Sequence, residues 1–82
     1  MYRIVTENKN AETIKAFLGS FGLDYTVYYC EGSWQGQTEN SMVVELGSVS
    51  EEIAEAMAQF IKQTNVQQAV LIQNIPVTSR LI

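Results

Sequence analysis

Two strand-like runs decide the fold, and they lie within residues 24–46, which read DYTVYYCEGSWQGQTENSMVVEL. The first run, residues 24–31, is dense in aromatic and β-branched residues, which favour strands. The second run places three apolar residues on one strand face, Met42, Val44 and Leu46. Because the residues between the runs are polar and contain two glycines, we predict a hairpin with an elaborated loop from Gly32 to Ser41.

The first run has two rather apolar faces, so its periodicity leaves open which face meets the core. The two faces are Tyr25/Val27/Tyr29 and Thr26/Tyr28/Cys30. We expect Tyr25 and Val27 to point inward. The three tyrosines either line a pocket between subunits or fill cross-strand packing between neighbouring strands.

Upstream of the hairpin, the sequence predicts a strand and a helix. Residues 2–7 alternate between two faces, as a half-buried strand does. Asn10 is expected to cap a helix that begins at Ala11, because its side-chain oxygen can accept a hydrogen bond from a first-turn amide. The apolar stripe of this helix is Ile14, Phe17, Leu18 and Phe21. Gly19 and Gly22 bracket its end.

Downstream of the hairpin, a second and longer helix is predicted. Ser48 and Glu51 stand at capping-box spacing before it, with Ser50 as the competing cap. Its apolar stripe is Ile53, Met57, Phe60 and Ile61, with Ala54 and Ala58 beside it. Asn65 is expected to cap its C-terminal end.

A fourth strand is predicted over residues 67–75, whose centre is a continuous apolar run. Pro76 ends this strand because it lacks an amide donor. The tail of residues 77–82 ends in apolar residues, and we expect it to pack on the sheet or on a neighbouring subunit.

The order strand, helix, strand, strand, helix, strand predicts an α+β domain of the ferredoxin-like βαββαβ type over residues 1–82. In this fold a four-stranded antiparallel sheet carries both helices on one face. The other face stays uncovered, and here it would present Tyr, Thr and Val side chains. Small proteins with such a face commonly dimerise through it or bind a ligand there.

The composition narrows the classes of function. The 82 residues are 46% hydrophobic and 17% charged, with a net charge of -4, one cysteine and no histidine. No intrachain disulfide can form, a zinc site lacks its usual ligands, and Cys30 is expected to be a small core residue. The acidic balance argues against DNA or RNA as a partner. No cofactor is expected.

Size and the N-terminal residues add two further expectations. A domain this small buries little core, so association into a homo-oligomer would stabilise it. The apolar run at Tyr2–Val5 is too short for a signal peptide or a membrane span, so we expect a cytoplasmic location and no membrane partner.

The hairpin also carries a pattern of short elements. They are Asp24-Tyr-Thr-Val, Gly32-Ser-Trp34, Glu39-Asn-Ser41 and, after the second helix, Gln68-Ala-Val-Leu71. Over residues 22–72 the chain resembles small uncharacterised ferredoxin-like proteins carried by phages and bacteria, which share a G-x-W … E-x-S hairpin. The resemblance implies the fold and a phage-like provenance, with action in the host cytoplasm. It also marks Trp34, Glu39 and Ser41 as residues to consider for a functional site.

The candidate ligand-binding residues are Trp34, Gln35, Gln37, Glu39, Ser41, Tyr28 and Arg3. Trp34 either stacks on a flat ligand or covers an open edge of the core. Glu39 and Ser41 share a strand face and offer an acceptor and a hydroxyl, or form an ordinary solvated face. Gln35 and Gln37 suit recognition of a nucleobase edge or a plain turn.

No enzyme signature is present: there is no histidine, no phosphate-binding glycine loop and no nucleophile elbow. Our first hypothesis is a non-enzymatic ligand-binding oligomer, a phage anti-defence protein that sequesters a nucleotide-like signal. The alternative is a protein-interaction inhibitor or adaptor, acting through the acidic cluster Glu51, Glu52 and Glu55.

Overall fold

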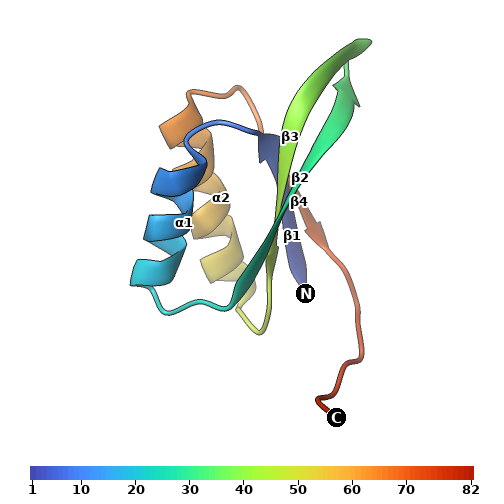
Figure 1. The fold of residues 1–82 in the computed structure, drawn as a ribbon. Helices are drawn as coiled ribbons and strands as arrows, with labels where there is room; N and C mark the ends of the chain where they lie inside the picture. Colours follow the sequence, from blue (N-terminus) through green and yellow to red (C-terminus); the bar gives the residue numbers. More distant parts are fainter.

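Alternating apolar residues build the two central strands of the sheet, β1 (Tyr2–Glu7) and β3 (Gln37–Leu46). These strands pair antiparallel, with Ile4 opposite Val44. β2 (Tyr25–Trp34) pairs with β3, and β4 (Leu71–Asn74) pairs with β1, both antiparallel. The computed structural model, which describes residues 1–82, therefore has the sheet order β2-β3-β1-β4 (Figure 1).

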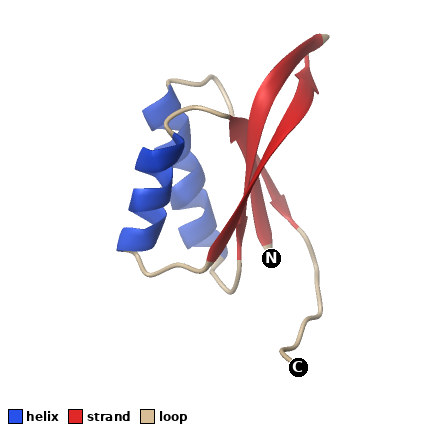
Figure 2. Ribbon diagram, viewed as in Figure 1, coloured by secondary structure: helices blue, strands red, loops and turns tan.

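The helices α1 (Ala11–Ser20) and α2 (Glu51–Asn65) lie side by side on one face of this sheet (Figure 2). The predicted ferredoxin-like βαββαβ fold is confirmed in its element order, its four-stranded antiparallel sheet and the placement of both helices on one face. Neither helix has the length and apolar character that crossing a bilayer requires.

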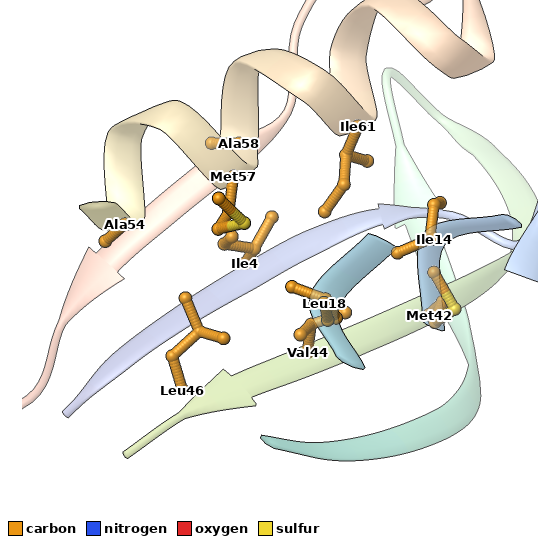
Figure 3. Close-up of a cluster of buried hydrophobic side chains, with 10 residues drawn as sticks. All are labelled: Ile4, Ile14, Leu18, Met42, Val44, Leu46, Ala54, Met57, Ala58 and Ile61. Carbon is orange, nitrogen blue, oxygen red and sulfur yellow. The ribbon is translucent and has the colours of Figure 1, made fainter. Parts of the chain in front are cut away.

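The core lies between the sheet and the helices (Figure 3). Its ten side chains are Ile4, Ile14, Leu18, Met42, Val44, Leu46, Ala54, Met57, Ala58 and Ile61. The inward orientation predicted for the apolar residues of β3 is confirmed, and Tyr25 and Val27 pack against this core as expected. Two alanines of α2 belong to the buried face because their small side chains let the helix approach the sheet closely.

The helix ends differ in part from the expected caps. Ser50 caps α2, and its hydroxyl oxygen accepts a hydrogen bond from the amide of Ile53 at 3.3 Å. The C-cap of α2 is Val66, in the left-handed region at φ 53°, so the expectation that Asn65 would be the cap is wrong. Asn10 is the N-cap of α1, but its side chain makes no capping hydrogen bond.

Asn10 and Asn65 instead join the two helices through their side chains. The amide of Asn10 donates to the side-chain oxygen of Asn65 at 3.0 Å and to the carbonyl of Thr64 at 3.3 Å. Asn65 is buried, and its own amide donates to Gln67 Oε1 at 2.8 Å and to Thr6 Oγ1 at 3.3 Å. The Thr6 hydroxyl donates to the same oxygen of Gln67. This network links β1 to the start of α1 and the end of α2.

The predicted loop from Gly32 to Ser41 is instead mostly strand. β2 continues to Trp34 and β3 begins at Gln37, so only Gln35 and Gly36 connect them. Both have positive φ, 52° and 77°, which is the type I′ turn whose twist matches that of the flanking strands. The polar, glycine-containing composition of this segment suggested a loop. In the structure, hydrogen bonds between β2 and β3 continue up to the turn.

The extension of this hairpin forms an arm. β1 reaches only as far as Ser41 on β3, so the ladder of residues 31–40 is supported by no third strand. The arm projects past the end of β1, at the top of Figure 1. An isolated two-stranded ribbon gains little stability in water.

The fourth strand is shorter than predicted. It covers Leu71–Asn74, while Gln67 follows the C-cap of α2 and its amide donates to the carbonyl of Lys62 at 3.0 Å. Beyond the strand, Ile75 exchanges two hydrogen bonds with Met1, at 2.7 and 3.0 Å. Residues 76–82 then run away from the sheet as an extended tail, so the tail does not pack on the sheet of its own chain (Figure 1).

The type I′ turn makes a prediction for unfolding experiments. Gly36→Ala should destabilise the protein by about 1 kcal/mol, because alanine is strained at positive φ. Gln35→Asn should stabilise it by a few tenths of a kcal/mol or more, because asparagine tolerates this conformation better. Urea denaturation measures both. Gly19→Ala is the control: Gly19 is helical with free space around it, so alanine should stabilise. Equal signs for the two alanine variants would contradict the turn type.

The buried amide of Asn65 makes a second stability prediction. Asn65→Ala should cost about 1–3 kcal/mol, because it removes the amide that donates to the buried hydroxyl oxygen of Thr6 and leaves Gln67 Oε1 with the Thr6 hydroxyl as its remaining donor. The exposed Gln63 of the same helix is the control, and its alanine variant should change stability by less than about 0.5 kcal/mol. Equal losses for both variants in thermal denaturation would show that the network contributes nothing.

Candidate ligand-binding face

The face of the sheet opposite the helices is uncovered, and we call it the open face (Figure 2). Strand side chains alternate between faces. Because Ile4 and Val44 are buried under the helices, their neighbours Arg3, Val5 and Glu45 point to the open face. The uncovered face predicted from the order of helices and strands along the chain is therefore present.

The register of the strands brings three polar side chains of the open face together. Arg3 lies opposite Glu45, and its Nη2 and Nε donate to Glu45 Oε2 at 2.7 and 3.1 Å. From β2, the hydroxyl of Tyr28 donates to Glu45 Oε1 at 3.1 Å. Glu45 is thus held from both sides, and only 15% of its side chain is exposed.

These contacts shift two ionisation equilibria. The hydrogen bond from Arg3 is the main cause that lowers the pKa of the Glu45 carboxyl, against the opposing effect of desolvation. The hydrogen bond to Glu45, together with its negative charge, raises the pKa of the Tyr28 hydroxyl. At neutral pH the cluster therefore consists of a guanidinium, a carboxylate and a neutral phenol.

A shallow depression of about 420 Å³ lies over this cluster, and we call it the sheet depression. Its lining residues are Arg3, Val5, Tyr28, Cys30, Val43, Glu45 and Gln73. The expectation that Cys30 would be a core residue is wrong, since its side chain is exposed here. It shares a strand face with Tyr28, whereas the core takes the opposite face of β2, with Val27.

The three tyrosines do not form one cluster. Tyr28 lies on the open face, whereas Tyr25 and Tyr29 lie on the helix side. The hydroxyl of Tyr25 donates to the carbonyl of Lys15 at 3.5 Å, and the Lys15 ammonium lies 5.9 Å from the ring centre of Tyr29. Of the three, only Tyr28 is available to a ligand in the sheet depression.

Trp34 lies at the tip of the arm, opposite Gln37. Strand alternation puts it on the same side of the hairpin as Tyr28 and Cys30, and so on the open face. Its side chain is 58% exposed, so the alternative that it covers an edge of the core is wrong. An indole exposed to this extent offers one flat surface for stacking.

The remaining candidate residues of the arm differ in access. Gln35 and Gln37 are exposed, and Glu39 is partly exposed opposite Gly32. Ser41 is buried, at 3% exposure, and its Oγ lies 2.7 Å from the point where a Cβ on Gly32 would sit. Ser41 therefore fills the space above the glycine, and Gly32 permits that close packing.

The candidate residues fall into two groups on one face. Six strand positions separate Tyr28 from Trp34, or about 20 Å along β2. Eight positions separate Glu45 from Gln37 along β3, or about 26 Å. Within one chain, the structure therefore brings together Arg3 and Tyr28, and separately the arm residues, but it does not join the two groups.

Sequence reasoning missed the part of Glu45 in the candidate site. The spacing of Val43 and Glu45 predicts that they share a strand face. No local pattern in the sequence predicts that Arg3 lies opposite Glu45. No group of three cysteine or acidic side chains is arranged to hold a metal ion.

Comparison with known proteins returns no relative: neither a protein-family model nor a curated protein sequence matches the chain. The function is therefore argued from the geometry of the open face.

The ion pair of the open face makes a prediction about pH. Because the folded-state pKa of Glu45 is lowered, its stabilising effect is present above the unfolded pKa of about 4.3 and is lost as pH falls through the folded value. Wild type should therefore exceed Glu45→Gln in stability at pH 6, and the difference should shrink as pH falls below about 4. Thermal unfolding against pH measures it.

Glu31→Gln is the control for this experiment, since Glu31 lies on the same hairpin, is exposed and makes no ion pair. Its difference from wild type should stay small over the same range of pH. A pH-independent difference for Glu45→Gln would contradict the inferred role of the ion pair.

Proposed function

We propose that this protein is a non-enzymatic ligand-binding oligomer that holds a nucleotide-like ligand on its open face, between copies of the chain. The observation that carries the proposal is the position of Trp34, 58% exposed at the tip of a projecting arm, on the same face as the sheet depression.

The arm supplies what a flat heteroaromatic ring requires. Stacking of a base on an aromatic side chain is worth about 1–3 kcal/mol. Gln37 lies opposite Trp34 and Gln35 follows it in the turn, so two exposed amides flank the indole. Each amide donates and accepts hydrogen bonds, as the edge of a nucleobase does.

The separation of the two groups supports a site between copies. A distance of about 20 Å from Trp34 to Tyr28 exceeds the reach of one mononucleotide. In a two-fold pair that joins open faces, the arm of each copy would extend over the sheet depression of the other. Trp34 of one copy would then cover a ligand that lies on Tyr28 of its partner.

The charge of the face limits how a phosphate would bind. Arg3 is the one cation lining the sheet depression, and Glu45 already pairs with it. A phosphate would share the guanidinium with that carboxylate, so stacking and amide hydrogen bonds would supply most of the affinity. Glu45→Gln, which frees the guanidinium, would tighten binding of a phosphorylated ligand more than that of its nucleoside.

Binding without chemical turnover would lower the free concentration of the ligand. For a phage-borne protein, the nucleotide-like ligand would be a signal of host defence, which fits the resemblance of the hairpin to phage-borne proteins. This is the anti-defence role that we propose for the chain.

Trp34 is the sole tryptophan, so its fluorescence tests the proposal directly. Titration with a panel of linear and cyclic nucleotides should identify one that changes the emission. At a ligand concentration of about 100 Kd, binding should add roughly 2.7 kcal/mol to stability and so raise the melting temperature. Trp34→Ala should lose roughly 5- to 150-fold in affinity by calorimetry, given the energy of stacking.

Phe21→Ala is the matched control, because Phe21 is 59% exposed but lies at the end of α1, away from the arm. It should bind the same nucleotide with unchanged affinity. If no nucleotide of the panel changes the emission, the melting temperature or the calorimetric heat, the proposed function is wrong.

A further inference from the structure

A second hollow lies away from the open face, between α2 and β4, and we call it the edge groove. Its volume is about 660 Å³. The base of the groove is apolar and consists of alanine, valine and isoleucine side chains. Two glutamates and one lysine also line the groove. The residues that matter here are Glu52, Glu55, Ala56, Lys62, Ala69 and Val70.

The edge groove runs beside a free edge of the sheet. β4 is the last strand of the order β2-β3-β1-β4 and pairs only with β1. Its other side presents backbone groups that no strand of the same chain engages. Such an edge accepts an extended segment from another chain, whose alternate side chains enter pockets beside the strand.

The tail of the chain has the matching properties. Leu81 and Ile82 are fully exposed and Val77 is 54% exposed, so the apolar side chains at the end of the tail are uncovered in their own chain. Arg80 makes no ion pair, whereas Arg3, Lys9 and Lys15 each do. The tail is thus an extended segment with unburied apolar side chains and a free positive charge.

We propose that residues 77–82 of one copy bind in the edge groove of a second copy, and that the exchange is reciprocal. Leu81 packs on the base at Ala56 and Val70, and Arg80 pairs with Glu52 or Glu55. The charges are complementary, since the groove carries two carboxylates against one ammonium. The lengths are compatible as well: the groove is lined by α2 from Glu52 to Lys62, about 15 Å, and six extended residues span about 20 Å, enough to cover it.

The geometry favours the groove of a second copy over that of the same chain. Ile75 is tied to Met1 by two hydrogen bonds, and the chain that follows runs away from the sheet (Figure 1). To reach its own groove, the tail would have to reverse direction directly after Pro76. That turn would use residues that the groove needs.

Paired cysteines test the exchange. In a Cys30→Ser background, one population carries Ala56→Cys and the other Leu81→Cys. Mild oxidation of the mixture should give the covalent heterodimer roughly tenfold or more faster than oxidation of either population alone, because docking raises the local thiol concentration. The chain that carries both substitutions should form covalent dimers and no intramolecular disulfide. Circular dichroism checks that each variant is folded.

Charge reversal tests the pairing of Arg80. Arg80→Glu in the Leu81→Cys population should slow heterodimer formation severalfold, and Glu55→Arg in the Ala56→Cys partner should restore it. Glu31→Arg, on the distant arm, should restore nothing.

Two results would overturn the proposal. The first is an intramolecular disulfide in the doubly substituted chain. The second is a mixture of the two folded variants that gives no covalent heterodimer on oxidation, even if the proteins associate through another surface. Nucleotide titration of Trp34 reports on the open face, so failure of one proposal is distinguishable from failure of the other.

Discussion

The register of β3 is the constraint on which the rest of the structure depends. This strand pairs with β2 along its whole length and with β1 from Ser41 to Leu46. Val44 enters the core between Ile4 and Val27, and Glu45 therefore faces the other side. A slip by one residue would bury Glu45 and expose Val44, and the free energy of burying an unpaired carboxylate excludes it. The core and the open face are thus fixed together.

The same register separates the places where the chain can bind other molecules. β3 is longer than its partner β1, so its first residues leave the sheet as the arm. Trp34 is exposed because no third strand reaches it, and Arg3 is neutralised because β1 does reach Glu45. The two groups of candidate residues share a face but not a site. For this reason we propose that the site is completed between copies of the chain.

The ends of the elements, by contrast, are fixed by polar groups. Asn65, which the sequence suggested as a helix cap, gives its amide to Thr6 and Gln67 and so joins α2 to the central strand. Gln67 is thereby held at the helix end, and β4 begins only at Leu71, with the edge groove beside it. The tail that follows β4 leaves its own chain with its apolar side chains uncovered.

Local pattern in the sequence determined the six elements, their order and the inward residues of β3, because period and propensity act over a few neighbouring residues. It also singled out Trp34, Arg3 and Tyr28. The tertiary structure alone decided that Arg3 meets Glu45, that Cys30 is exposed and that the supposed loop is a two-stranded arm. These features depend on which strands pair and in which register, across more than forty residues of chain between Arg3 and Glu45. No local pattern carries that information.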